Sequence, residues 1–483
     1  MKIVLVSPVS KAGNGGFILG LAYISAMLKK HGYLEISGFD LMYQSESDFL
    51  EASRDADIVG FYCTTRTFQE VRRLTGKVKE NNPEAFVATG GPHPTVVPDE
   101  VIRVDSIDMV CIGEGEHTML EVVRRLETGH RDLSDIPGIV WKKNGQPVRN
   151  RPRPVLTDLD SLPFPDWDLF DRSNYYSGLA TPIASRSCPY ACINCMPALR
   201  KIAGPYRRRS VENVVAELKE LKKDYGIDHV FFQDNDISVS RNWLNNLCNR
   251  LIEEDLKIRW HALCRVNTLD REIIKQMKQA GCVHINIGAE SGSQRVIELL
   301  NKKIDLEKVR HVVQWCNRER LEVTVFFMIG IPGETLEEMR STIEFAGSLK
   351  ADDLMISVAQ PVPYTNFEKI CRNNNWLLTD DPDDFDTPDR TGGMKCWIKT
   401  DQWGPEDIQS IKRDTRKILK NLGYQEIDNK FLFRNFDSII KKRGWDHVGL
   451  MAREEIRKFS KSRKIRDLLQ AGYFIAKKTM LSL

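Results

Sequence analysis

Three cysteines stand close together near the middle of the chain, in the stretch Cys188-Pro-Tyr-Ala-Cys192-Ile-Asn-Cys195. Thiolates at this spacing on a loop are typical ligands of a metal ion or an iron–sulfur cluster. A structural zinc site would need a fourth Cys or His close by, and the sequence offers none at a suitable spacing. Three thiolates can instead hold a cluster in which one iron stays open for another ligand. The spacing favours an iron–sulfur centre over a zinc site or three unrelated buried cysteines.

This C-x-x-x-C-x-x-C loop resembles the signature of the radical S-adenosylmethionine (SAM) superfamily. The resemblance implies that Cys188, Cys192 and Cys195 bind three irons of a 4Fe–4S cluster and that SAM binds the fourth iron. Reduction by an external flavodoxin- or ferredoxin-type donor would then cleave SAM to methionine and a 5′-deoxyadenosyl radical. Asn194 stands where the family usually has an aromatic residue against the adenine, so the chain departs from the family at this contact.

Further candidate residues follow the cysteines in the order that this family shows. Asp234 comes at the end of a predicted strand, where a carboxylate could bind an amino group. Arg265 follows the next strand and could hold a carboxylate with two parallel hydrogen bonds. The resemblance also implies SAM contacts from Glu290 and Ser291 in Gly288–Ser293, and from Gly330 and Pro332 in the turn Gly330–Glu334. The remaining eight cysteines show no ligand spacing and are predicted to be buried and inert.

The elements that must position these residues alternate between strands and helices. We predict strands at Thr181–Ser185, His229–Phe232, Lys257–Ala262, Val283–Gly288, Glu322–Met328 and Leu354–Val358. Helices are predicted between them, at Val211–Tyr225, Asn242–Glu254, Arg271–Ala280 and Leu336–Leu349, the last with a capping box. This pattern predicts a partial (β/α)6 TIM-type barrel with the cysteines at the carboxyl end of its first strand.

The first part of the chain shows a second α/β pattern. Strands are predicted at Lys2–Val6, Ile58–Tyr62, Ala85–Ala88 and Met109–Ile112, with helices at Ile18–Lys30, Phe68–Glu80 and Thr118–Leu126. Such alternation indicates a parallel, Rossmann-like sheet that binds a ligand in the loops at its carboxyl edge. Those loops are rich in glycine, proline and small polar residues, which let the backbone approach a large ligand closely. They are predicted at Pro8–Gly16, Cys63–Thr67, Gly90–Thr95 and Gly113–Glu116.

Four segments of this region resemble the cobalamin-binding subfamily of radical SAM proteins: Phe17–Tyr23, Thr89–Thr95, Cys111–Glu116 and Asp158–Trp167. The resemblance implies a cobalamin between the sheet and the barrel mouth. The residues expected to bind it are Gly16, Thr64, Gly90, Gly91, Pro92, His93, Thr95, Gly113 and Glu114. The D-x-H-x-x-G motif is absent, so no histidine is expected beneath the cobalt, and His93 is predicted to be a turn residue. The alternative is a sheet that keeps this shape without the corrin.

We therefore predict four segments. Residues 1–150 form a Rossmann-like cobalamin-binding domain, 151–178 a linker, 179–368 the radical SAM barrel and 369–483 a mainly helical region. Tyr364 stands where relatives usually have glycine, which indicates altered packing near the barrel mouth.

Composition restricts the remaining classes. The 483 residues are 41% hydrophobic and 28% charged with a net charge of +3, as in globular proteins. The longest apolar runs are too short to span a bilayer, and Met1–Val9 lacks the layout of a signal peptide, so we expect a cytoplasmic enzyme. Residues 411–483 carry a net charge of +11, which indicates a solvated helical face or a surface for anions. No aromatic residues interleave this region in a nucleic-acid-binding pattern, and its apolar end at 471–483 favours a packed helix over membrane contact.

The function that we favour is cobalamin-dependent methylation of an unactivated carbon in a small-molecule substrate, with a second SAM as the methyl source. One alternative is a radical cyclisation, dehydration or rearrangement without methyl transfer. A zinc-binding or redox-sensing adaptor that binds nucleic acid is the alternative from another class, and about four irons against one zinc per chain would separate the two.

Overall fold

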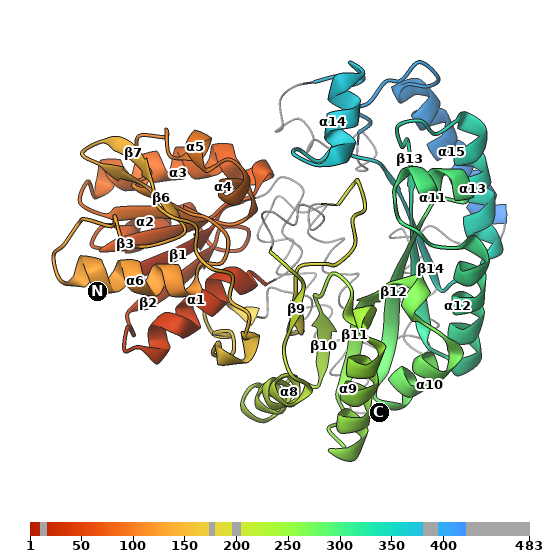
Figure 1. The fold of residues 1–483 in the computed structure, drawn as a ribbon, viewed down its shortest axis with the longest axis horizontal. Helices are drawn as coiled ribbons and strands as arrows, with labels where there is room; N and C mark the ends of the chain where they lie inside the picture. The colour runs from red at the N-terminus through yellow and green to blue at the C-terminus, as the bar shows by residue number, and fades with distance from the viewer. Residues whose placement is uncertain (10–16, 173–178, 196–203, 380–394, 422–483) are drawn as a thin grey trace, which may run out of the picture.

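The computed structural model describes residues 1–9, 17–172, 179–195, 204–379 and 395–421. Two α/β units lie side by side, one formed by the first third of the chain and the other by its middle part (Figure 1). This division agrees with the fold class predicted from the alternating strand and helix patterns.

A seven-stranded sheet forms the first unit, with the strand order β2-β1-β3-β4-β5-β6-β7. Neighbouring strands from β2 through β5 are parallel, whereas β6 and β7 form an antiparallel hairpin at the edge. The strand β1, next to the edge strand β2, is buried along its whole length, as expected when helices cover both faces of a sheet. The bounds are β1 (Ile3–Ser7), β2 (Ile36–Asp40), β3 (Ile58–Tyr62), β4 (Phe86–Gly90), β5 (Met109–Cys111), β6 (Ile139–Lys143) and β7 (Gln146–Arg149).

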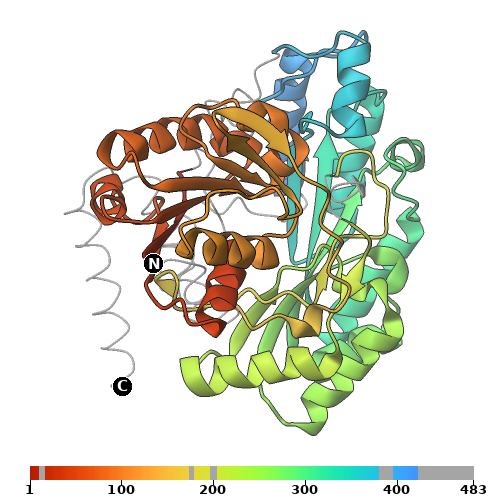
Figure 2. The ribbon, with the colours of Figure 1, turned by 60° about the vertical axis from the view of Figure 1, so that its left-hand side comes forward.

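Helices cover both faces of this sheet, as Figure 2 shows from a second direction. α1 packs with α6, and α2 packs with α3. The bounds are α1 (Leu19–Lys30), α2 (Glu46–Ser53), η1 (Thr65–Thr67), α3 (Phe68–Asn81), α4 (Pro92–Val96), α5 (Pro98–Val101) and α6 (Glu116–Glu127). The predicted loop Gly90–Thr95 is therefore wrong in part, because proline at the first helical position starts the short helix α4.

The segment after the first sheet is tied to that sheet by aromatic packing. Trp167 is buried, with its ring centroid 5.1 Å from that of Phe17, and the Phe170 centroid lies 5.6 Å from that of Phe17. The carboxylate of Asp166 accepts a hydrogen bond from Ser25 of α1 at 2.5 Å. The 3-10 turn η2 (Leu159–Ser161) is the helical element in the described part of this segment. The aromatic residues of the segment after the first sheet thus anchor that segment beside α1.

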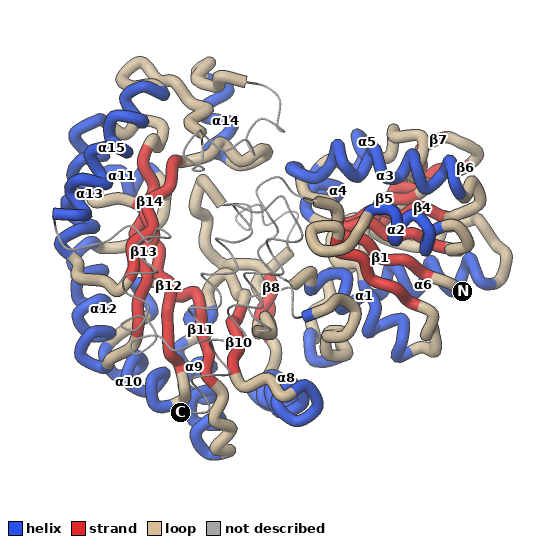
Figure 3. Tube along the Cα trace, turned by 180° about the vertical axis from the view of Figure 1, so that it is seen from behind, coloured by secondary structure: helices blue, strands red, loops and turns tan. Residues whose placement is uncertain are grey.

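The second unit contains a five-stranded parallel sheet in the order β10-β11-β12-β13-β14. Its strands are β10 (His229–Phe232), β11 (Arg259–Cys264), β12 (Cys282–Glu290), β13 (Glu322–Ile329) and β14 (Asp353–Val358). Its helices are α8 (Val211–Tyr225), η6 (Ile237–Val239), α9 (Arg241–Glu253), η7 (Val266–Thr268), α10 (Arg271–Gln279), α11 (Gln294–Leu299), α12 (Leu306–Glu319) and α13 (Leu336–Ser348). Figure 3 shows the strands on the inner side of this unit, facing the first unit, with helices outside.

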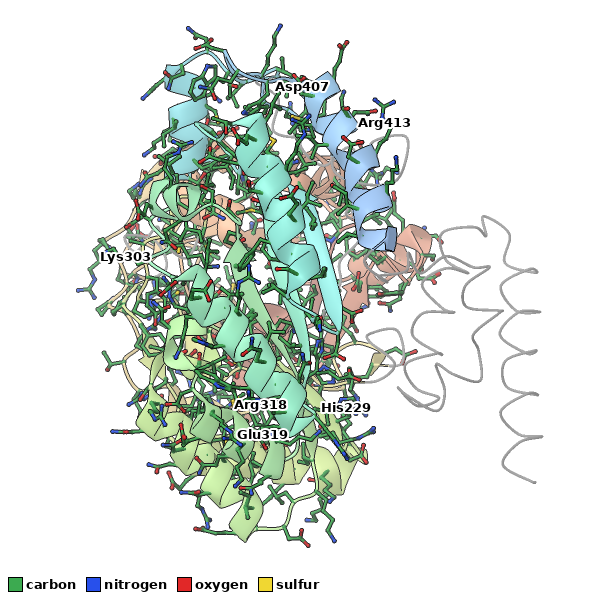
Figure 4. All side chains as sticks on the ribbon, turned by 90° about the vertical axis from the view of Figure 1, so that its right-hand side faces the viewer. His229, Lys303, Arg318, Glu319, Asp407 and Arg413 are labelled. Carbon is green, nitrogen blue, oxygen red and sulfur yellow. The ribbon has the colours of Figure 1, made fainter. Side chains whose placement is uncertain are left out.

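Side-chain burial follows that layering. In β12, Ile285, Ile287 and Ala289 are fully buried, whereas the alternate residues are half-buried. Figure 4 looks onto the outer layer, where Arg318 of α12 and Arg413 reach the surface. The sheet is thus closed on its outer face and partly open on its inner face.

The predicted first barrel strand, Thr181–Ser185, is wrong. A single parallel bridge joins Ala180 to Val230 of β10. Proline at 182 has no N–H to donate, and the Ala184 N–H donates to the Asp234 carboxylate at 2.9 Å instead of to a neighbouring strand. β8 (Ser185–Arg186) pairs instead with β9 (Arg207–Arg208) in an antiparallel ribbon.

Beyond the second sheet lie α14 (Asn366–Asn373) and α15 (Pro405–Asn421), with an isolated antiparallel bridge between Leu377 and Ile398. The greater part of the basic region 411–483, including its end at 471–483, lies outside the described residues. Among the helices that are described, none combines the length and the apolar character needed to cross a bilayer.

Candidate functional site

The three cysteines lie directly after β8. All three thiols are free and half-buried. Burial, followed by the neighbouring thiols of Cys192 and Cys188, raises the pKa of Cys195 to about 12. Burial also raises the pKa of Cys188, to which Asp236 and Cys192 contribute. These mutual effects place the three sulfur atoms near one another on one loop.

Arg265 lies against this loop. Its guanidinium stacks on the Tyr190 ring with 3.9 Å between the guanidinium carbon and the ring centroid. Its Nη1 is 3.9 Å from the Cys192 sulfur. Asp236, which sequence reasoning missed as a separate candidate, accepts the Arg265 N–H at 3.2 Å through Oδ1, while its buried Oδ2 has no hydrogen-bond partner among the described residues. A positive group and an unpaired carboxylate oxygen thus flank the cysteines.

Asp234 is also brought to this place, but both of its oxygens are engaged. Oδ2 accepts the Ala184 N–H at 2.9 Å, and Oδ1 accepts the Ser185 hydroxyl. Burial raises the pKa of Asp234 to about 6. The carboxyl group therefore holds the segment that leads into β8.

The remaining predicted SAM residues lie at the carboxyl ends of β12 and β13. Glu290 has a left-handed backbone (φ 68°) and forms an ion pair with Lys302. The buried Ser291 hydroxyl contacts Thr342 of α13 at 3.0 Å. The carboxylate of Glu334 organises the Gly330 turn by accepting the Gly330 and Ile331 N–H groups at 2.9 and 3.0 Å.

Pro332 is buried within the same turn. Glu290 and Lys302 both affect the Cys195 thiol, so they are close to the cysteines. Ser291, Gly330 and Pro332 shape the surrounding backbone.

A cavity of about 280 Å³ lies at the carboxyl edge of the first sheet. Its lining includes predicted cobalamin residues, namely Gly90, Gly91, Gly113 and Glu114, and also Ile183 and Arg186 of the second unit. Ligand pockets generally measure roughly 300 to 1,000 Å³, so a cavity of this size can hold part of a large cofactor.

Three glycines outside the predicted set of cobalamin-binding residues also line this cavity: Gly20 of α1, Gly60 of β3 and Gly115 before α6. Gly20 and Gly115 lie in the segments Phe17–Tyr23 and Cys111–Glu116 that resemble the cobalamin-binding subfamily. Gly60 was missed, and an isolated glycine inside a predicted strand was the available signal. Nothing lies within 4 Å of a Cβ added at Gly20, so a side chain there would enter open space.

The other predicted cobalamin residues are not among those that line the cavity. Thr95 joins two of its loops, since its hydroxyl donates to the Gly91 carbonyl at 2.8 Å and accepts the Gly113 N–H at 3.0 Å. Thr64 precedes η1, where its N–H donates to the Thr67 hydroxyl at 2.9 Å. Pro92 begins α4, and Gly16 lies outside the described residues.

His93 is predicted to be a turn residue, and the structure places it in α4 instead. Its side chain is buried beside Phe68, with ring centroids 4.6 Å apart. Nδ1 lies 3.3 Å from the Thr65 hydroxyl, and Nε2 has no hydrogen-bond partner among the described residues. Burial lowers the pKa of His93 to about 4, so the ring is neutral at physiological pH.

Both places fit the groups that the sequence implies. Three free thiols beside a guanidinium form a donor set suited to a 4Fe–4S cluster with an anionic ligand. Glycines around an interdomain cavity leave room for part of a cobalamin. Within the described part of the chain, no three His, Cys, Asp or Glu side chains are arranged to hold a single metal ion. A cluster differs from a single-ion site because each thiolate binds its own iron.

Comparison with known proteins finds matches to two families. The radical SAM superfamily model matches residues 183–346, and the B12-binding domain model matches residues 8–123. An uncharacterized methyltransferase of Pyrococcus horikoshii is 34% identical over 78% of this chain and 85% of its own length. The anaerobic magnesium-protoporphyrin IX monomethyl ester cyclase of Rubrivivax gelatinosus is 26% identical over 76% of this chain and 69% of its own.

Solved structures share the fold over almost the whole length. TsrM of Kitasatospora setae, a radical SAM methyltransferase with cobalamin and a 4Fe–4S cluster bound, has a TM-score of 0.70 at 17% identity, covering 95% of this chain and 100% of TsrM. The cobalamin-dependent SAM radical enzyme OxsB has a TM-score of 0.70 at 15% identity, covering 99% and 75%. Fold and site together define a radical SAM enzyme whose cofactors are a 4Fe–4S cluster, SAM and cobalamin. The chain belongs to the cobalamin-binding radical SAM superfamily.

Proposed function

We propose that the enzyme methylates an unactivated carbon of a small-molecule substrate. When bound, the 4Fe–4S cluster would supply reductive cleavage of SAM, and cobalamin would carry the methyl group. The observation that carries the proposal is the trio of free, half-buried thiols at the side of the second unit that meets the cobalamin-type sheet. The relatives include the Pyrococcus methyltransferase and the cytidylyl-2-hydroxyethylphosphonate methyltransferase of Streptomyces wedmorensis, 26% identical over 73% of this chain.

In this proposal Cys188, Cys192 and Cys195 hold the cluster. Arg265, 3.9 Å from the Cys192 sulfur, binds the carboxylate of SAM, since its fork of N–H groups matches a carboxylate. Glu290 lies at the carboxyl end of the neighbouring strand β12 and would contact the ribose or methionine portion of SAM. An electron donor of the flavodoxin or ferredoxin type supplies the reducing equivalents.

Four further residues act through the backbone. Asp234 fixes the segment that leads into β8 by accepting the Ala184 N–H. Ser291, Gly330 and Pro332 form the turns around the adenosyl portion of SAM, where the Glu334 carboxylate keeps the Gly330 turn in place.

In the first unit, Gly90, Gly91, Gly113 and Glu114, which line the cavity, would contact the cobalamin. Thr64, Pro92, His93 and Thr95 shape the neighbouring loops, and Gly16 belongs to the loop after β1. We assign residues 1–150 to the cobalamin domain, 151–178 to the linker, 179–368 to the barrel and 369–483 to the C-terminal region.

Anoxic reconstitution with iron, sulfide and hydroxocobalamin, followed by incubation with SAM and a reductant, tests this function. We expect both 5′-deoxyadenosine and S-adenosylhomocysteine among the products. Deoxyadenosine without S-adenosylhomocysteine would contradict methylation and leave the radical step standing. The absence of both, in a protein that holds iron, would contradict radical chemistry as well.

A radical cyclisation without methyl transfer is the second candidate. It is favoured by the cyclase of Rubrivivax gelatinosus, which matches 76% of this chain. The same assay separates the two candidates, because a cyclase forms deoxyadenosine and consumes no second SAM as a methyl source.

A further inference from the structure

The loop that carries the cysteines is closed at its base by the β8–β9 ribbon. Ser185 pairs with Arg208 and Arg186 pairs with Arg207, so the chain leaves the ribbon after Arg186 and re-enters it at Arg207. We refer to the described residues 187–195, which carry the three cysteines, as the cysteine loop. Arg186 is two positions before Cys188, and Ser187 between them has a left-handed backbone (φ 70°) with its hydroxyl donating to the Gly204 carbonyl at 2.9 Å. Any movement of the ribbon therefore moves the first cysteine.

Both arginines of the ribbon reach across to the first unit. Arg186 Nη1 lies 2.9 Å from Glu114 Oε1, and its Nη2 lies 2.6 Å from Glu116 Oε1. Arg207 Nη1 lies 2.9 Å from Glu114 Oε2 and 2.8 Å from the Leu156 carbonyl oxygen. Glu114 thus bridges the two arginines. These four charged residues, Glu114, Glu116, Arg186 and Arg207, form what we call the ion cluster.

The ion cluster is largely removed from solvent. The exposed fractions of the side chains are 14% for Arg186, 6% for Arg207, 6% for Glu116 and 28% for Glu114. Burial opposes charge on Arg186, yet Glu116 and Glu114 raise its pKa above the usual value. Its guanidinium also lies 5.0 Å from the centroid of the Tyr23 ring on α1. Two positive and two negative charges compensate one another, so separating the units would leave buried charges unpaired.

Three of the four residues of the ion cluster also line the cavity in the first unit, whereas Arg207 does not. Tyr23, Glu114, Glu116 and Arg186 all line it. One side of the ion cluster therefore faces the space assigned to cobalamin, and the other side is the base of the cysteine loop.

We propose that Arg186 and Arg207 are positioning residues that couple cobalamin binding in the cavity to cluster assembly on the cysteine loop. The inference rests on the proposed function for the location of both cofactors. Cobalamin that contacts Glu114 and Arg186 orders the ion cluster. The iron–sulfur cluster orders the cysteine loop, and Arg186 and Arg207 form the base of that loop. The cofactor that binds second does not have to order these contacts again. Cobalamin and the iron–sulfur cluster therefore strengthen the binding of one another by the same factor.

The test is the dissociation constant of hydroxocobalamin, measured by anoxic equilibrium dialysis on the full chain with and without the reconstituted cluster. Coupling between sites is commonly about 5- to 150-fold, and we expect cobalamin to bind about tenfold more tightly to the cluster-loaded protein. In Arg186→Met the ratio of the two constants should fall to about one. Glu114→Gln keeps the side-chain shape and should reduce the ratio in the same direction, which provides the test if Arg186→Met does not fold.

Arg153→Met is the matched control. Arg153 pairs with Glu121 of α6 at 3.0 and 2.6 Å, so it also links the interdomain segment to the first unit, but it does not contact the ribbon. The control should keep the tenfold ratio. If Arg186 had only a structural role, Arg186→Met and Arg153→Met would both lower the melting temperature, and both would keep the tenfold ratio of the two dissociation constants.

A wild-type ratio of one, or an unchanged ratio in Glu114→Gln, would overturn the inference. A protein that takes up neither iron nor cobalamin would overturn it together with the proposed cofactor sites. If the ratio responds as expected and no S-adenosylhomocysteine forms, only the proposed methylation fails.

Discussion

The cysteine loop and the cavity of the first unit recognise their cofactors by opposite means. The loop presents side chains, with three thiols, the Arg265 guanidinium and the Glu290 carboxylate near one another. The cavity instead depends on positions without a side chain, because glycines from α1, β3 and β4 stand among the apolar residues that line it. The first site is therefore sensitive to the removal of a group, whereas the second is sensitive to the addition of one.

This difference also affects how the two sites depend on charge. The groups around the cysteines are titratable and partly buried, so their protonation is coupled to burial. The cavity is mainly lined by apolar and glycine residues, and its charges are those of the ion cluster. Four variants would break or sharpen the contrast.

Replacing Cys188, Cys192 and Cys195 together by alanine should have the largest effect. Without thiolates there is no ligand for iron, so the iron content after anoxic reconstitution should fall from about four atoms per chain to nearly none. Cys248→Ala is the control, because this fully buried thiol lies in α9 and should keep the iron. Full iron uptake by the triple variant would contradict the assignment of the three thiols as iron ligands.

Gly20→Leu tests the opposite kind of site. A leucine here projects into open space at the cavity, so the dissociation constant of hydroxocobalamin should rise at least about a hundredfold, or about 3 kcal/mol. Helix α1 should become more stable by about 1 kcal/mol, because glycine inside a helix is unfavourable.

Gly76→Leu in α3 is the matched control, since a Cβ there also meets nothing within 4 Å and this residue does not line the cavity. It should gain the same stability and keep its affinity for cobalamin. Equal losses of affinity in the two variants would contradict a specific role of the cavity.

Glu334→Gln tests the cost of burying a carboxyl group in the second unit. Burial raises the pKa of Glu334 to about 8, from an ordinary value of 4.5. The folded protein thus keeps a proton that the unfolded chain releases, and wild-type stability falls as the pH rises from 4.5 to 8. Each pKa unit corresponds to about 1.4 kcal/mol, and relaxation reduces the total, so we expect the variant to gain about 2 kcal/mol over wild type between pH 5 and pH 8.5. Melting temperatures across that range would measure it, and parallel curves for the two proteins would contradict it.

His93→Phe should show a smaller effect with the opposite pH dependence. Burial lowers the pKa of His93 to about 4, from 6.5. The unfolded chain binds a proton that the folded protein excludes, so the contribution of His93 is present above pH 6.5 and is lost as the pH falls through 4. Relative to wild type, the variant should gain about 1 kcal/mol between pH 7 and pH 4.5. Urea unfolding at the two pH values measures this, and a pH-independent difference would exclude the explanation.

The fold could be predicted largely because its periodicities are local. Five predicted barrel strands and the four predicted strands of the first unit lie within a few residues of the observed ones. The hairpin β6–β7 was missed although Asn144 and Gly145, both with positive φ, form a turn pair typical of hairpins. The strand expected at Thr181–Ser185 failed because a distant carboxylate, Asp234, takes one of its N–H groups.

By itself the sequence determined which side chains could hold iron, the order of strands and helices, and the superfamily that the motifs resemble. Only the tertiary structure decided which glycines share a cavity wall and that Arg186 and Arg207 meet Glu114. It also decided that His93 is buried with no partner for Nε2 among the residues that the structure describes. The reason is distance along the chain. Ligand spacing is encoded within eight consecutive residues, whereas the arginines and Glu114 are 72 and 93 positions apart and meet only because the β8–β9 ribbon packs against the first unit.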